Sequence, residues 1–514
     1  MKTFKSIISP VLMIAMLIYT GCSKSFLDHP LENNPPVTNI DYTDLSLMYQ
    51  PVSGVYKVAA TGGFTEWIGT FMKTSQSDDI DPNTGYPEVN DLVHTFKNTA
   101  VQSFWAVNEL WNNYYRVIIN ANNALAELDK FGKNVSPGDA ANNGVLSRCR
   151  AEVRFFRALG NYYLARSYGD VPILGEESIN PGYLDTVHKS KVADVRMYIM
   201  GEIDFCIANL EDLRPNEVPS PRTGAVTKYT ALMLKAKAAM DLAGNDNASP
   251  YWDIVLNATN QIISSHKFSL FSDYYQLWKK PGKLSNEAIL EFQYSDFGGV
   301  TDIRTSGPDV WNNLFLFQGP PNTYGSPISG SGWLVPSDNA FDFLTVRNDV
   351  IRIKTVFEKC GINGDVKTYA VTPAGDTVSG NDGRKKYFNG KAYFPKSQMT
   401  PGQGWYGGNN NIHFWRYADI LLMNAEARMR KGQNGDAPLN EVRMRVGLPP
   451  LTNATIDQLL DERRAEFICE WWGERLNDLI RTDRAASVLP GFVKGQGEFL
   501  PVPQGQIDIN SNLR

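Results

Sequence analysis

Apolar residues at helical spacing in both halves of the chain constrain its fold more than any other feature. Over residues 103–131, large apolar side chains recur every three or four residues, which is the spacing of one face of an α-helix. Gly132 follows directly, and glycine commonly ends such a helix. The same spacing predicts further helices over residues 144–168, 192–213, 225–242, 251–264, 414–431, 439–446 and 456–472.

Short loops separate most of these helices, so successive helices should lie antiparallel and stack as helical hairpins. The helices show no clean repeat of about 34 residues, so their spacing alone does not assign them to tetratricopeptide units. The sequence therefore predicts a mainly α scaffold. Four tryptophans fall on the apolar stripes and are expected in its core: Trp105, Trp111, Trp471 and Trp472.

The centre of the chain differs in composition. Residues 265–411 are rich in Gly, Pro, Asn and aromatic residues, and the Gly-Pro-Pro run at 319–321 excludes regular structure there. Strand-like pieces occur at 288–294, 350–356 and 386–394. A long irregular insertion on a helical scaffold is usually functional or disordered, and the many aromatic residues argue against disorder. We expect a large irregular, partly β insertion that carries the function.

The first residues have the features of an export leader. Two lysines precede an apolar stretch over residues 7–19, which is shorter than the ~20 residues that cross a bilayer. The stretch ends in Thr20-Gly21-Cys22, which resembles the lipobox of bacterial lipoproteins, where the cysteine thiol carries lipid after cleavage. We expect residues 1–21 to be removed and Cys22 to anchor the chain without a membrane-spanning segment.

Charge and composition exclude several functions. The 514 residues carry a net charge of -5, and loss of the leader, which has two lysines and no acids, makes the chain more acidic. A mildly acidic chain without basic blocks is a poor candidate for nucleic acid. The five histidines are scattered without metal-binding spacing, and the sequence has no P-loop, nucleophile elbow or dinucleotide fingerprint.

Paired acids are the best sign of catalysis in the chain. A glycosidase needs two carboxylates across a cleft, and Asp461/Glu462 and Glu470/Glu474 are pairs of acids. They lie on a patterned helix with arginines nearby, which favours ion pairs that stabilise helix packing. Apart from Cys22, the cysteines form no CxxC pair and are expected to be free thiols, several of them in helices: Cys149, Cys206, Cys360 and Cys469.

Aromatic residues in loops indicate a ligand site. A glycan binder needs flat aromatic faces against the apolar faces of sugars and polar groups for the hydroxyls. Residues 61–95 and 311–333 combine both, and the glycine-framed residues 405–406 are a third candidate. The predicted ligand-binding residues are Trp67, Tyr86, Trp311, Phe315, Tyr324, Trp333 and Trp405. The alternative for each is that it fills a local loop core, and Trp333, next to two apolar residues, is the clearest case.

Several segments together resemble the SusD/RagB family, in the order expected of that family. They are EVRFFRAL (152–159), YGDVPI (168–173), WRYADILLMNAE (415–426), LNEVRMRVGLP (439–449), DERRAEF (461–467) and LPVP (500–503). The resemblance spans the mature chain and is weakest in the insertion, which is where such proteins differ in what they bind.

The resemblance implies an outer-membrane lipoprotein of Bacteroidota on a tetratricopeptide-like helical-hairpin scaffold. Such proteins cover a SusC-type TonB-dependent transporter and hand it captured nutrients, most often oligosaccharides, without cleaving them. The implied partners are that transporter and an oligosaccharide, and the membrane is reached by the lipid anchor only, facing the cell exterior. A peptide ligand stays open, and a helical glycoside hydrolase is the weaker alternative. No cofactor is implied, although a structural calcium ion in the insertion stays open.

These inferences divide the chain into successive parts. They are a signal peptide at 1–21, a lipidated tether at 22–40, an N-terminal helical scaffold at 41–264 with a ligand-facing loop at 61–95, a ligand-binding insertion at 265–411, and the C-terminal part of the same scaffold at 412–514.

Overall fold

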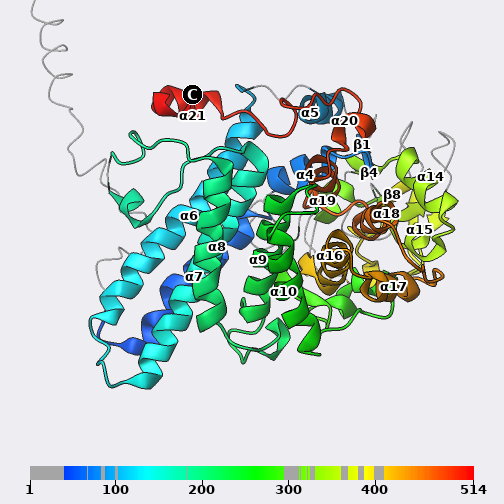
Figure 1. Ribbon diagram of the computed structural model, residues 1–514. Helices are drawn as coiled ribbons and strands as arrows, with labels where there is room; N and C mark the ends of the chain where they lie inside the picture. Colours follow the sequence, from blue (N-terminus) through cyan, green and yellow to red (C-terminus); the bar gives the residue numbers. More distant parts are fainter. Residues whose placement is uncertain are drawn as a thin grey trace, which may run out of the picture.

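The computed structural model describes residues 40–65, 67–82, 87–98, 102–180, 182–294, 312, 314–320, 322–323, 330, 332–359, 369–379, 387–398 and 410–514. These residues form a mainly α protein with a few short strands. Long helices fill one side of the molecule, and the strands gather with shorter helices on the other (Figure 1).

Five long helices of the N-terminal half pack each against the next along the chain. Figure 1 shows them as a row of rods, with α6 and α7 joined at one end as a hairpin. The predicted helices are confirmed here, and their ends shift by about one turn at most. Their bounds are α6 Trp105–Gly132, α7 Ala140–Tyr168, α8 Val192–Asn209, α9 Lys228–Ala243 and α10 Tyr251–Ser264.

A glycine brings the first two of these helices close together. Gly160 of α7 faces Ile118 of α6, and a Cβ at Gly160 would lie 2.8 Å from Ile118 Cγ1. The start of α7 is capped by Asp139, whose carboxylate accepts a hydrogen bond from Asn142 N at 3.0 Å. Gly169 ends the helix with a φ of 72°, a conformation that glycine adopts without strain.

The C-terminal residues continue the same scaffold. Helix α16 packs against α10 and α9, and one hydrophobic core contains side chains of both halves. Gln504 N donates to Gln102 O at 2.8 Å, which brings α21 back against α6. The bounds are α16 Tyr417–Arg430, α17 Asp436–Arg445, α18 Ile456–Phe467, α19 Glu474–Arg481, α20 Ala485–Val488 and α21 Gln504–Ile509.

The helix predicted over 456–472 ends five residues early. Cys469 and Gly473 have φ values of 59° and 69°, and this left-handed backbone turns the chain between α18 and α19. The tryptophans between them are nevertheless buried, as predicted: Trp471 and Trp472 are 2% and 4% exposed.

The two ends of the insertion leave the scaffold together, because β2 and β9 pair antiparallel. The remaining described strands form small sheets, β1 with β4, β3 with β7 and β6, and β5 with β8. The bounds are α11 Tyr274–Leu277, β2 Ala288–Phe292, α13 Leu314–Gln318, β3 Asn322–Thr323, β4 Leu334–Pro336, α14 Asp338–Val346, α15 Val350–Val356, β5 Phe357–Lys359, β6 Tyr369–Val371, β7 Thr377–Ser379, β8 Tyr387–Asn389 and β9 Ile412–Arg416.

One predicted strand is wrong, since residues 350–356 form helix α15. Its β-branched residues favour a strand, but Asp349 caps a helix by accepting from Arg352 N at 3.3 Å. The Asp349 carboxylate also lies 2.6 Å from the Arg352 guanidinium. Arg352 is buried against Glu462 and Glu466, so tertiary ion pairs hold the segment as a helix.

The early segment predicted as a loop at 61–95 contains helices α4 and α5 with strand β1 between them. The described elements before α6 are η2 Leu45–Tyr49, α3 Gln50–Val58, η3 Ala59–Gly63, α4 Trp67–Ser75, β1 Ile80–Pro82 and α5 Pro87–Asn98.

The core predictions hold with one exception. Trp111 is buried, but Trp105 is 51% exposed, because it is the first residue of α6. Its ring lies 5.9 Å from that of Phe104. The three described thiols are free and buried, and desolvation raises the pKa of Cys149 to about 12. Cys360 lies outside the described residues.

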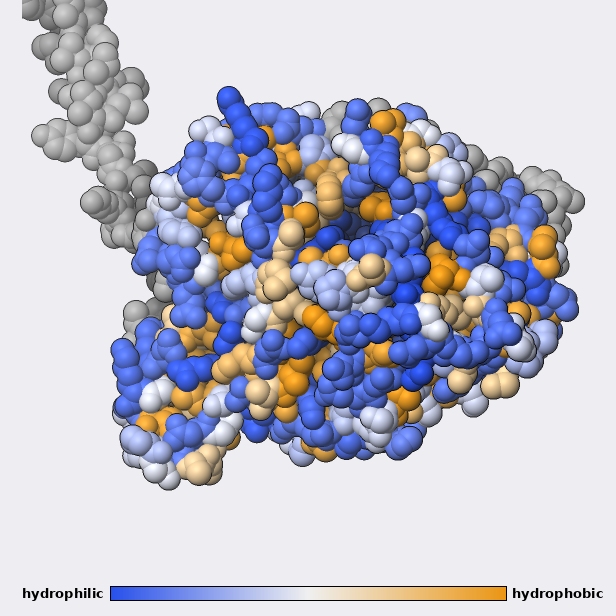
Figure 2. Space-filling view, in the orientation of Figure 1, coloured by the Kyte–Doolittle hydropathy of each residue, from blue (hydrophilic) through white to orange (hydrophobic). Residues whose placement is uncertain are grey.

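Figure 2 shows a face that is mainly hydrophilic, with hydrophobic residues in small separate groups. Within the described ranges, no helix has the length and apolar character that a bilayer span requires. The same residues contain no group of three His, Cys, Asp or Glu side chains placed to hold a metal ion.

Candidate functional site

The early segment and the insertion pair through strands β1 and β4, and we call this place the junction. They pair antiparallel with Ile80 opposite Pro336 and Pro82 opposite Leu334. Helix α4, before β1, also contacts α13, before β4. Two segments more than 200 residues apart in the sequence therefore form one surface, beside α19 in Figure 1.

Two aspartates fasten the junction to the C-terminal helices. Asp78 accepts from Arg475 Nε at 2.9 Å and lies 3.1 Å from Arg464 Nη2, which also contacts Asp79 at 2.8 Å. Burial acts to raise the pKa of Asp78, but the two guanidinium groups outweigh it and hold that pKa below its usual value. Burial of Asp79, with a second carboxylate beside it, raises the pKa of Asp79.

The insertion is fixed to the same aspartates by the start of α14. Ser337 Oγ donates to Asp78 O at 2.7 Å, and Ser337 N donates to Asp79 O at 2.9 Å. Ser337 also caps α14 by accepting from Ala340 N at 3.0 Å. Asn339 Nδ2 reaches Asp78 Oδ2 at 3.3 Å. The backbone of the junction is thus held from both sides.

A cleft of about 420 Å³ opens at the junction. This volume lies in the range of ligand-binding pockets. One wall carries carboxylate, hydroxyl and amide groups, and the other is apolar. The polar wall includes Gln76, Ser77, Asp81, Ser337, Asp338 and Asn339, and the apolar wall includes Leu476, Val488, Leu489, Pro490 and Phe492. Such a pairing suits a ligand with hydroxyl or amide groups on an apolar frame.

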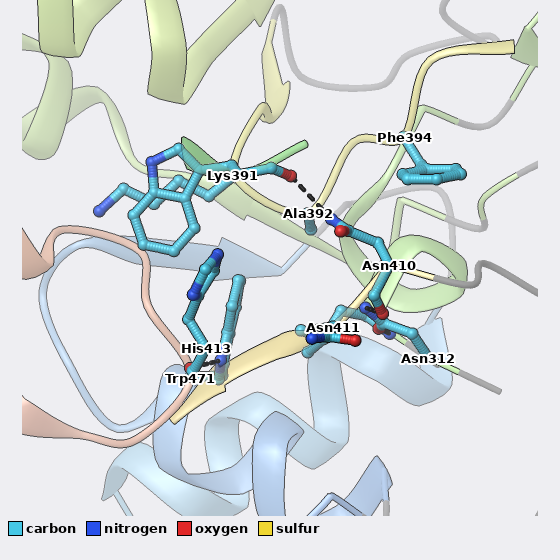
Figure 3. A pocket seen from close by; sticks show the side chains of 10 residues that line it. Asn312, Lys391, Ala392, Phe394, Asn410, Asn411, His413 and Trp471 are labelled. Carbon is cyan, nitrogen blue, oxygen red and sulfur yellow. Dashed lines mark hydrogen bonds between the residues drawn. The ribbon is translucent and has the colours of Figure 1, made fainter. Parts of the chain in front are cut away.

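A second cavity lies where the insertion leaves the scaffold (Figure 3). Its free volume is about 10 Å³, which is about the space for one water molecule, so no sugar or peptide fits. Asn410 Nδ2 donates to the Trp278 carbonyl at 2.9 Å, and Trp471 Nε1 donates to His413 O at 3.2 Å. Dashed lines in Figure 3 mark hydrogen bonds among the residues that line this cavity. We regard this cavity as a structural joint.

His413 in this joint forms a buried ion pair. Its Nδ1 lies 2.7 Å from Glu291 Oε1, and its Nε2 lies 2.8 Å from Leu277 O. Both nitrogens face acceptors, so the protonated ring satisfies both. Burial acts to lower the pKa of His413, but the Glu291 carboxylate outweighs it and raises that pKa. The pair joins β2 to β9 at the base of the insertion.

The predicted aromatic site residues are only partly described. Trp333 is half-buried, with its ring 5.2 Å from that of Phe317 and 6.5 Å from that of Phe71, so it joins α4 to α13. Trp67 begins α4 and Phe315 belongs to α13, which contact each other. The other predicted site residues, Cys22, Tyr86, Trp311, Tyr324 and Trp405, lie outside the described residues.

Sequence reasoning missed the walls of the cleft. Ser337-Asp338-Asn339 has the signature of a helix start, which would have located α14 but not the cleft. The apolar wall at 488–492 carries no motif and lies far along the chain from both predicted segments. Only the tertiary fold brings it to the junction.

Three of the four paired acids that suggested catalysis are held in ion pairs, and the fourth, Asp461, is exposed. Glu462 lies 2.8 Å from Arg352, Glu470 lies 2.8 Å from Lys391, and Glu474 lies 3.1 Å from Arg166. The preferred structural interpretation of Glu462, Glu470 and Glu474 is therefore confirmed.

Two family models match separate parts of this chain. One, described as "SusD family", matches residues 356–514, and the other, described as "Starch-binding associating with outer membrane", matches residues 39–209. The fold and the junction define a helical scaffold protein with a long, partly β insertion. The chain belongs to the SusD/RagB family.

Relatives and solved structures agree with this assignment. A SusD-like protein of Bacteroides ovatus is 22% identical over 90% of this chain and 81% of its own length. SusD-like protein P25 of Formosa agariphila is 24% identical over 59% of this chain, which spans only 55% of that relative's length. The starch-binding protein SusD of Bacteroides thetaiotaomicron is 22% identical over 65% of this chain and 64% of its own.

Solved structures with the same fold cover nearly the whole chain. A laminarin binding SusD-like protein has a TM-score of 0.74 at 24% identity, covering 90% of this chain and 97% of that one. Surface glycan-binding protein A from Bacteroides thetaiotaomicron, in complex with laminarihexaose, has a TM-score of 0.74 at 21% identity, covering 91% and 98%. The mainly α fold is thereby confirmed.

Proposed function

We propose that this chain is a lipid-anchored, cell-surface binding protein that captures oligosaccharides and delivers them to a SusC-like TonB-dependent transporter in the outer membrane. The observation that carries the proposal is the cleft at the junction, where the early segment and the insertion form one surface. Relatives with this fold are named as binding laminarin or starch, which supports a glycan as the ligand.

Ligand contacts are proposed on both sides of this junction. The polar wall supplies donors and acceptors for hydroxyl groups, and the apolar wall packs against the C–H faces of a sugar. The aromatic residues of the two predicted segments supply further flat faces. They are Trp67, Tyr86, Trp311, Phe315, Tyr324 and Trp333, with Trp405 from the third segment.

Binding without cleavage is part of the proposal. Glycoside hydrolysis needs an acid and a second carboxylate placed across the bound sugar. Glu462, Glu470 and Glu474 are engaged by arginine or lysine, and the relatives are named as binding proteins. Anchoring is proposed through lipid on Cys22.

A peptide is the second candidate ligand, and one observation favours it. The polar wall of the cleft contains Asp81 and Asp338, and no arginine or lysine is among the described residues that line it, so the cleft is acidic. An acidic cleft attracts cationic groups, which peptides carry and neutral glycans lack.

A binding panel separates these candidates. The mature chain with Cys22→Ser, which prevents lipidation, is titrated with laminarin, starch and a tryptic peptide mixture, and the glycans are then assayed for new reducing ends. We expect saturable binding of a glycan and no new reducing ends. If only peptides bind, the proposed ligand is a peptide and not a glycan. If new reducing ends appear, the protein is a glycoside hydrolase.

A further inference from the structure

A second groove, lined by none of the residues of the junction cleft, runs along α6. Its volume is about 310 Å³, within the range of small-molecule sites. One wall is α6 itself, and the other is formed by Pro172, Leu174, Leu184 and Val187 and by the last helices, α21 and η9 Ser511–Leu513. Figure 1 shows α21 beside one end of α6.

Side chains hold the walls of this groove in place by bonding backbone carbonyls. Tyr115 Oη donates to Pro172 O at 2.8 Å. Asn510 Nδ2 donates to Leu184 O at 3.1 Å and to Val187 O at 2.8 Å. The groove is thus preformed, and a ligand does not have to order it on binding.

The accessible part of the groove is aliphatic. The rings of Trp111 and Tyr115 form its floor, but they pack on each other at 4.9 Å and are only 3% and 7% exposed. They leave no flat face for a sugar ring. Leu184, by contrast, is 40% exposed, and Ile119 and Val187 are half-buried. These three side chains offer a surface for an alkyl chain.

The rim of the groove is polar. Asn112, Arg116 and Asn120 are spaced four residues apart and form a stripe on α6 beside the floor. Arg116 donates to Gly62 O through Nη1 at 3.2 Å, and its Nη2 lies 3.9 Å from the Glu109 carboxylate. The exposed guanidinium therefore keeps N–H groups for an anion, which it binds best as a planar carboxylate.

We propose that this groove binds a small amphipathic carboxylate, with its aliphatic chain along Ile119, Leu184 and Val187 and its carboxylate on Arg116. The apolar wall and the single cation at the rim match the two ends of such a molecule. The proposal is independent of oligosaccharide capture at the junction.

Sodium decanoate, below its micelle concentration, is the probe. Calorimetric titration of the mature chain with Cys22→Ser should show saturable binding. Ile119→Trp, which fills the groove, should weaken it at least about tenfold, and Arg116→Gln about tenfold, the usual loss of a charge-assisted hydrogen bond. Lys57→Gln, the matched removal of an exposed cation on α3, should leave the affinity unchanged, and Arg116→Gln should leave glycan binding unchanged.

Several results would overturn this assignment. One is the absence of saturable binding, and another is equal affinity in the wild type and Ile119→Trp. Should that variant fail to fold, Leu184→Asp, at an exposed position, tests the same wall. Dodecylphosphocholine, which has an alkyl chain but no carboxylate, distinguishes an acyl lipid from a free carboxylate as the ligand. If it binds as tightly as decanoate, and if its affinity does not depend on Arg116, the groove recognises an acyl lipid instead of a free carboxylate.

Discussion

Arg475 binds Asp78 through two parallel contacts, Nε to Oδ1 at 2.9 Å and Nη2 to Oδ2 at 3.1 Å, although 397 residues separate them. This bidentate pair links the early segment, just before β1, to α19. The pair is mostly shielded from water, with side chains 15% and 8% exposed. It therefore fixes the junction at which we place the ligand.

Breaking this pair should destabilise the protein. Asp78→Ala leaves Arg475 and Arg464 without one of their carboxylates, so we expect the free energy of unfolding to fall by ~3 kcal/mol. Urea denaturation measures it. The control is Lys494→Gln, which removes an exposed pair with Asp483 and should leave the unfolding free energy within error. Equal effects of both variants would contradict a structural role for Asp78.

Lys73 of α4 should destabilise the folded state at neutral pH. It is 5% exposed, no carboxylate is within ion-pairing distance in the described part of the chain, and burial together with Arg166 lowers its pKa to about 7. The unfolded chain, where the pKa is 10.5, binds more protons between these values, so stability should rise with pH across that window. Lys73→Met should remove this rise and add ~1–3 kcal/mol at neutral pH. A less stable variant would contradict the prediction.

His413 should act in the opposite direction. Its pKa is raised in the folded state above the ordinary value of 6.5, so its stabilisation is complete below that pH and is lost as pH rises through the folded-state value. In a Lys73→Met background, unfolding free energies at about pH 6 and about pH 9 isolate this effect. We expect the unfolding free energy to fall more between these two pH values when His413 is present than in the His413→Gln variant. Identical losses would show that the Glu291 pair does not titrate in this range.

Two aromatic residues of the insertion should contribute to ligand affinity. Trp311→Ala and Tyr324→Ala are each expected to weaken binding of the captured glycan by ~1–3 kcal/mol, as large aromatic contacts do. Calorimetry measures the affinity, and an unchanged melting temperature shows that the fold is intact. Trp105→Ala is the matched control, because Trp105 is an exposed tryptophan outside the predicted segments. Unchanged affinity in both site variants would remove them from the site.

The helical scaffold could be predicted because apolar spacing records local structure directly. The helices at 105–132 and 251–264 lie almost where their spacing places them. The strand predicted at residues 350–356 was wrong, because β-branched side chains favour a strand. The ion pairs of Arg352 decide for a helix, and their partners, Glu462 and Glu466, lie about 110 residues away in sequence. The prediction that Trp105 is buried was wrong, because its position on an apolar stripe does not show that it is the first residue of its helix.

The site could be predicted only in part, for the same reason. Loop composition identified the early segment and the insertion, and β1 and β4 do bring them together. The wall formed by Leu476 and residues 488–492 has no composition signal, because its role depends on the Arg475 and Arg464 contacts that place α19 and the following loop at the junction.

Hydrogen–deuterium exchange of the mature chain, with and without a saturating oligosaccharide from the panel, tests capture at the junction most directly. We predict slower exchange at residues 76–82 and 334–339, on the two sides of the cleft. Protection confined to the α6 groove, at residues 111–120 and 172–187, or elsewhere away from the junction, would contradict oligosaccharide capture there.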